Sequence, residues 1–378
     1  MKNSLSFRIL TLAGLSAVVL GFSSCSKDDE LQQKPVTEAP STYNFTNVNY
    51  SGQTARLLLL KNLEAEMEKA KTQTVTKAQL MAIFENTANL HTDISTDKRL
   101  SDKMASPADK QQVEAWFADI ETLSAQGKGY VTDNGIDLKQ MVAKTIMGSV
   151  FYNRALNDYL DPAKLADDDN STVTEGNGTE MEHHFDEGFG YFGAARTYNN
   201  FTDAEIASPG HKDVNGDGVM DPKSEVNFYF AQTAAKRDAG YADFTTAQTD
   251  FTSEIFTEML KGRHAVSQKN YTQRDEAVNK IRASWDRLIA ATVIHYAKAV
   301  KTDLDNVATD PSAINLENRA KHWSEMKAYF AMIRYNAGNK LGQAHMSHVD
   351  GLLGANSSEV TAAGLDEAIA QLKSSYNF

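Results

Sequence analysis

Apolar residues recur at three- and four-residue steps through most of this chain, and this spacing constrains the fold more than any other feature. Such steps place side chains on one face of an α-helix. The longest stripe lies within residues 270–304 and consists of Ala277, Ile281, Trp285, Leu288, Ile289, Thr292 and Tyr296. The alternating pattern of a half-buried β-strand is not evident. The sequence therefore predicts an all-α protein built from helical bundles.

Capping residues and prolines predict where several helices begin. Thr76 followed by Gln79, and Ser106 followed by Pro107, are typical helix starts. The later helices are expected over residues 226–238, 245–261, 270–304, 311–336 and 359–375. Residues 161–180 are acidic and polar and are expected to form a loop, as is the segment that contains His345 and His348.

The first 24 residues have the composition of a signal peptide. Lys2 and Arg8 form a basic start, and a short apolar run follows to residue 22. This run is shorter than the roughly 20 residues that a membrane-spanning helix needs. Phe22-Ser23-Ser24-Cys25 then resembles a lipobox, in which the cysteine thiol receives the lipid. The alternative is an ordinary secretory signal with an incidental cysteine.

Cys25 is the single cysteine of the chain, so no intramolecular disulfide can form. Lipidation explains a lone cysteine at the end of a signal peptide better than redox chemistry does. The next residues, Ser26-Lys27-Asp28-Asp29-Glu30, resemble the surface-export signal of Bacteroidetes lipoproteins. We therefore expect an outer-membrane lipoprotein, exposed at the cell surface if this segment acts as that signal. Residues 25–42 would be the lipidated cysteine and a flexible tether.

The charge balance limits the partners of the chain. It has 38 basic and 50 acidic residues and a formal net charge of −12. This excess of negative charge argues against nucleic acid and against direct binding to anionic lipid surfaces. The expected membrane contact is therefore the lipid anchor. Beyond the tether we expect an N-terminal helical lobe (43–206), a calcium-type loop (207–225) and a C-terminal helical lobe (226–378).

Residues 213–225 have the spacing of a calcium-binding loop. Oxygen ligands are expected at the first, third, fifth, seventh and ninth positions, and Gly218 occupies the sixth. Ser224 stands at the twelfth position, where a glutamate is usual, and Glu225 follows it. The expected ligands of a structural Ca²⁺ are Asp213, Asn215, Asp217, Val219 through its carbonyl, Asp221 and Glu225. The alternative is a surface turn without metal.

A second candidate site lies at His184 and Glu187. These residues are three apart, so on a helix they share one face and could bind one metal ion. A nitrogen and a carboxylate ligand suit Fe or Zn better than calcium. The alternative is a polar cluster at a helix start with no metal.

The same segment resembles a known family. His184-x-x-Glu187, followed by the glycine-containing stretch 188–193, is similar to the Gly-x-His-x-x-Glu segment of imelysin-like proteins, with Glu182 in place of the first glycine. The wider chain resembles an uncharacterised Bacteroidetes lipoprotein family related to imelysins. This resemblance implies a helical envelope protein with a role in iron uptake, and it implies metal ligation by His184 and Glu187.

Two functions fit these sequence features. The first is a metal-binding accessory of iron or other transition-metal uptake, with an outer-membrane transport system as its partner. The second is a surface interaction or scaffold lipoprotein with only a structural calcium site. Peptidase activity is not supported, because the sequence contains no His-Glu-x-x-His motif and no Gly-x-Ser-x-Gly motif.

Lipidation can be tested with the Cys25→Ala variant. Acyl chains contribute about 0.8 kcal/mol per buried CH₂ group, and stable anchoring needs more than one chain or signal. We expect the wild-type protein to fractionate with membranes and the variant to be lost from them. A variant that stays membrane-bound like the wild type would contradict the lipoprotein assignment.

Overall fold

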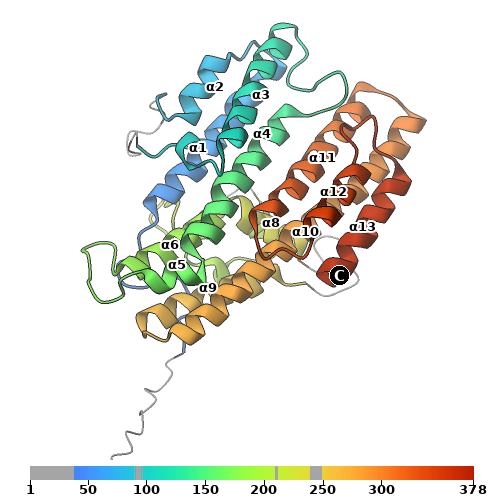
Figure 1. Ribbon diagram of the computed structural model, residues 1–378. Coiled ribbons are helices and arrows are strands. Elements are labelled where there is room, and N and C mark those ends of the chain that lie inside the picture. Colours follow the sequence, from blue (N-terminus) through green and yellow to red (C-terminus); the bar gives the residue numbers. More distant parts are fainter. Residues whose placement is uncertain (1–37, 89, 91–94, 96, 209–211, 239–248) are drawn as a thin grey trace, which may run out of the picture. The chain divides into compact units, whose positions relative to one another are not determined.

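The 39-residue helix α10 (Tyr271–Thr309) is the longest element of the structure and contacts helices α8, α9, α11 and α13. In this computed structural model the described residues are 38–378, apart from 89, 91–94, 96, 209–211 and 239–248. Figure 1 shows α11 lying beside α10 and α9 meeting its start. The signal peptide, Cys25 and most of the tether lie outside the described residues.

Thirteen α-helices occur in the described part of the chain, and no β-strand does, which confirms the all-α prediction. Short 3₁₀ and π-helical turns join or extend several of them. The π-helical turns η3 (Met147–Tyr152) and η4 (Ala155–Tyr159) continue the line of α4. The helices are α1 (Ser51–Glu68), α2 (Lys77–Phe84), α3 (Pro107–Ala125), α4 (Leu138–Ile146), α5 (Pro162–Asp167), α6 (Glu180–Phe192), α7 (Asp203–Ala207), α8 (Tyr229–Arg237), α9 (Phe251–Ser267), α10, α11 (Ala313–Met332), α12 (Gln343–Leu352) and α13 (Ala362–Tyr376).

Trp285 of α10 lies at the centre of the aromatic core. It is fully buried, and its ring contacts Tyr152, Phe192 and Phe230 in edge-to-face geometry. Aromatic pairs of this kind add about 0.5–1.5 kcal/mol each to the stability that burial supplies. The core therefore joins α10 to η3, α6 and α8.

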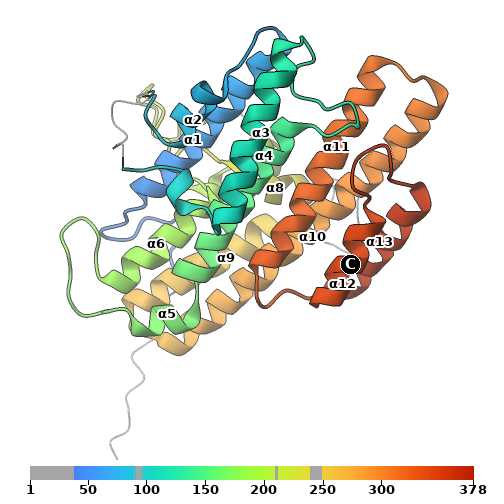
Figure 2. The same cartoon turned by 45° about the horizontal axis from the view of Figure 1, so that its top comes forward.

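Helices of the two expected lobes, 43–206 and 226–378, contact each other directly. Helix α4 packs against α11, and α6 packs against α9, as the second view also shows (Figure 2). Residues 39–378 form one compact unit. Both sets of helices therefore share one core.

Local start signals locate several helices correctly. Thr76 and Gln79 form the expected capping box of α2, and Ser106 accepts the backbone N–H of Asp109 at the start of α3. Helix α9 begins at Phe251 rather than near residue 245, because Asp250 caps it through the N–H of Ser253.

The expected loop around His345 and His348 is wrong, because both residues lie on α12. Their Nε2 atoms lie 2.9 Å from Gln371 and Glu367 of α13. Helix α12 has no side-chain cap, so its start lacks the local signal that marks α2 and α3. Contact with α13 stabilises a helix that the sequence alone does not indicate.

None of the helices in the described residues combines the length and the apolar character that crossing a membrane requires.

Candidate metal centre on helix α6

Helix α6 carries the His184 segment, and its start is fixed by local hydrogen bonds. Thr179 and Glu182 form a capping box, in which each side chain accepts the backbone N–H of the other residue. Asn170 Oδ1 accepts a hydrogen bond from the Thr179 hydroxyl, and Asn170 Nδ2 donates one to the Val266 carbonyl of α9. The first turn of α6 is therefore tied to α9.

The glycines after Glu187 lie inside or at the end of α6 and permit close packing. A Cβ atom at Gly188 would meet Leu160 at 2.5 Å, and one at Gly190 would meet Tyr50 at 2.7 Å. Gly193 ends the helix with a φ of +83°, a conformation that favours glycine. The glycine-containing stretch thus lets α6 approach α1 and the end of η4.

A buried arginine of α9 holds the next face of α6. Arg263 and Asp186 are both fully buried, and Arg263 Nε donates to Asp186 Oδ1 at 2.8 Å. Arg263 Nη1 donates to Glu182 Oε1 at 2.8 Å, and the Tyr43 hydroxyl donates to Asp186. Burial raises the pKa of Asp186 to about 6 even with the guanidinium beside it. Asp186 and Glu182 therefore serve the packing of α6 on α9.

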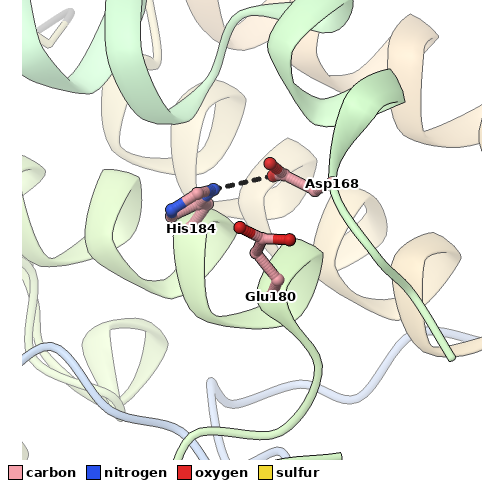
Figure 3. Close-up of side chains that lie close together, drawn as sticks. All are labelled: Asp168, Glu180 and His184. Atoms are coloured by element: carbon pink, nitrogen blue, oxygen red, sulfur yellow. Dashed lines mark hydrogen bonds and ion pairs between the residues drawn. The ribbon is translucent and has the colours of Figure 1, made fainter. Parts of the chain in front are cut away.

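His184 faces the end of α5 and lies close to two carboxylates, one after α5 and one on α6 itself. His184 Nδ1 lies 2.7 Å from Asp168 Oδ2, and Glu180 stands one turn before His184 on α6 (Figure 3). Within the described residues, Asp168, Glu180 and His184 are the one group of three histidine, cysteine or acidic residues whose ligand atoms lie within 4.8 Å of one another. We call these three residues the His184 cluster. It offers one nitrogen and two oxygen ligands, a donor set that suits Fe, Zn or Mn.

The sequence missed two members of this cluster. Asp168 directly follows α5, a short helix inside the segment expected to be a loop, where Asp161 caps the first turn. Sixteen residues separate Asp168 from His184, so no local pattern joins them. Glu180 stands four residues before His184, and this helical spacing was available in the sequence.

Glu187, the ligand expected beside His184, is not a member of the His184 cluster. Its Oε1 accepts the side-chain N–H of Gln53 from α1 at 2.7 Å. Glu187 also lines a pocket together with His183, while His184 does not. The structure therefore brings Glu187 to α1 and His184 to α5.

The expected calcium ligands lie on an irregular loop before α8. Asp213 accepts the N–H groups of Gly216 and Gly218, and Asp217 accepts that of Val219. Asn215 accepts the N–H of Asp217, and Asp221 accepts that of Lys223. These bonds shape the turn that the Asp/Asn/Gly spacing predicts.

Glu225 faces the inside of this loop and is 1% exposed. Its Oε1 accepts the N–H of Val214 at 3.0 Å, and its Oε2 accepts the N–H of Asp221 at 2.9 Å. The Glu225 carboxylate, at the thirteenth position, thus binds the backbone at the second and ninth positions of the loop. In the part of the chain that the structure describes, the loop carboxylates do not form a group of three within 4.8 Å of one another.

Fold and site together define an all-α protein with a nitrogen and oxygen donor cluster at the start of one helix. The chain belongs to the family described as domain of unknown function DUF4856, whose model matches residues 118–320, more than half of the chain. The matched region contains α6, the 213–225 loop and α10. Comparisons with curated proteins and with solved structures find no match.

We predict that Arg263→Met strongly destabilises the fold. Removing one partner of a buried ion pair costs about 3–5 kcal/mol, because the other charge stays buried without compensation. Protonation can neutralise Asp186 below its raised pKa of about 6, so the loss should be smaller at pH 5 than at pH 7.5. Urea unfolding of the variant and the wild type at both pH values measures this difference.

The Arg263→Met/Asp186→Asn double variant is the control for this prediction. It removes both charges, so its free energy of unfolding should exceed that of the single variant at pH 7.5. Equal stability of the single and double variants at pH 7.5 would show that the ion pair does not control this part of the core.

Proposed function

We propose that this chain is an envelope lipoprotein that binds a transition metal through the His184 cluster and serves as an accessory in iron or other transition-metal uptake. The observation that carries the proposal is the convergence of Asp168, Glu180 and His184 within 4.8 Å. An outer-membrane location, exposure at the cell surface and work beside an outer-membrane transport system are parts of this proposal. A relation to imelysins, based on His184-x-x-Glu187, is also part of it.

The donor set fits a transition metal better than a larger, harder cation. Calcium prefers six to eight oxygen ligands, whereas one imidazole with two carboxylates suits Fe, Zn or Mn. Asp168 is half-buried and Glu180 is exposed, so an ion could reach the cluster from solvent. Asp168 Oδ2 already lies 2.7 Å from His184 Nδ1, so this carboxylate stands beside the imidazole that would bind the same ion.

Metal binding is tested by elemental analysis of protein purified without chelators, followed by calorimetric titration with Zn²⁺ and, without oxygen, with Fe²⁺. We expect His184→Ala, Asp168→Asn and Glu180→Gln each to weaken binding at least 10–100-fold, since changes to outer partners already cost that much. Affinity should fall at acidic pH, because only neutral imidazole binds metal.

Glu187→Gln and His345→Ala are the matched controls. Glu187→Gln keeps the size of the side chain and tests the ligand pair that the sequence predicts. If it weakens metal binding while Asp168→Asn and Glu180→Gln do not, the metal site is the His184 and Glu187 pair instead. Unchanged affinity in His184→Ala would exclude both sites, and His345→Ala should bind like the wild type.

A second candidate function, an interaction or scaffold lipoprotein with a structural Ca²⁺, is favoured by the position of Glu225. Its buried carboxylate sits inside the 213–225 loop and accepts the backbone N–H groups of Val214 and Asp221. We propose Asp213, Asn215, Asp217, Val219, Asp221 and Glu225 as the calcium ligands. Calcium there would stabilise the connection between α7 and α8, whichever partner the protein binds.

Calcium binding should raise the melting temperature of metal-free protein. A ligand at a hundredfold excess over its Kd stabilises the folded state by about 2.7 kcal/mol. Extracellular sites of this kind have a Kd of about 10⁻⁴–10⁻³ M, so millimolar and higher Ca²⁺ is needed. Asp217→Ala should abolish the increase, whereas Asp133→Ala, an acidic loop residue elsewhere, should retain it. Melting curves that calcium leaves unchanged would exclude the site.

A further inference from the structure

Beside the His184 cluster, a small polar pocket lies between α1, α6 and the residues around η2 (Ser101–Lys103). Its volume is about 210 Å³, below the roughly 300–1,000 Å³ of pockets for drug-sized ligands. The lining residues that matter for its chemistry are Gln53, Arg56, Lys98, Lys103, His183 and Glu187. We call this hollow the Glu187 pocket.

Two polar atoms at the Glu187 pocket lack a hydrogen-bond partner among the described residues. Gln53 is 1% exposed, and its Oε1 accepts no hydrogen bond; His183 Nδ1 also has no partner. The Gln53 amide cannot turn over, because its Nε2 donates to Glu187 Oε1 at 2.7 Å and a reversed amide would face oxygen with oxygen. Buried polar atoms are normally paired, so Gln53 Oε1 is available to accept a hydrogen bond from a donor group of a bound molecule.

The pocket is locally cationic in a chain whose net charge is −12. Three cations line it, with Glu187 as the one carboxylate. Lys103 has no ion-pair partner in the described part of the chain. Arg56 forms a long ion pair with Asp102, at 3.8 Å, and Lys98 pairs with the exposed Asp97. Lysine and arginine side chains exclude a metal ion and attract an anion.

We infer that the Glu187 pocket binds a small hydroxylated carboxylate of the sugar-acid class. Its carboxylate would meet Lys103 and Lys98, and its hydroxyl groups would donate to Gln53 Oε1 and pair with His183. A neutral sugar would leave Lys103 without a counter-charge. An inorganic anion without hydroxyl groups would leave Gln53 Oε1 unpaired.

The test is calorimetric titration of the full chain with D-glucuronate, D-glucose and inorganic sulfate, an anion without hydroxyl groups, in metal-free buffer. We expect saturable binding of glucuronate and much weaker binding of the other two. Lys103→Met should weaken glucuronate binding roughly tenfold or more, because it removes a charged hydrogen bond. Lys98→Met is the second variant, and the circular dichroism and melting temperature of both establish that they fold.

Two controls separate this inference from other effects. Lys77 is half-buried like Lys103 and does not line the pocket, so Lys77→Met should bind glucuronate like the wild type. His184→Ala should also keep glucuronate binding, which distinguishes this site from the proposed metal centre. No saturable binding of glucuronate, equal binding of glucose or sulfate, or wild-type affinity in both pocket lysine variants would overturn the inference.

Discussion

The buried ion pair between Arg263 and Asp186 is the interaction on which the arrangement of α6 depends. Both side chains are fully buried, and Arg263 also binds Glu182 one turn earlier. Charges leave water at a large cost unless geometry and further hydrogen bonds compensate them. A rotation of α6 about its axis would separate these groups and leave a charge unpaired in the core. The ion pair therefore selects which face of α6 meets α9.

Once that face is fixed, the other faces of α6 meet different surroundings. His184 turns to Asp168 at the end of α5, while Glu187 turns to Gln53 of α1. Phe189, on the buried side, stacks on Tyr43 with ring centroids 3.7 Å apart. One helix thus borders an acidic cluster that suits a cation and a pocket lined by cations that suits an anion. The His184 cluster and the Glu187 pocket are neighbours, but the first is lined by carboxylates and the second mainly by cations.

Close packing around α6 depends on its glycines as much as on its charges. Gly188 brings Leu160 onto the helix, and Gly190 brings Tyr50 and Gln53. Side chains at these positions would push away the same segments that supply Gln53 and hold Tyr159 near His184. The apolar, glycine-containing stretch after Glu187 therefore permits the close packing that brings Gln53 onto α6.

Local residue patterns were enough to predict the helical class, the helix starts at Thr76 and Ser106, and the turn of the 213–225 loop. Each of these rests on contacts within about one helical turn or one tight turn, which local residue patterns encode directly. The tertiary structure decided that His184 meets Asp168 and that Glu187 meets Gln53, which is 134 residues distant in the chain. It also decided that residues 343–352 form a helix, which starts without a side-chain cap and packs on α13. Such pairings follow from the combined packing of many side chains and from the pairing of buried charges, and neither is a property of any short segment.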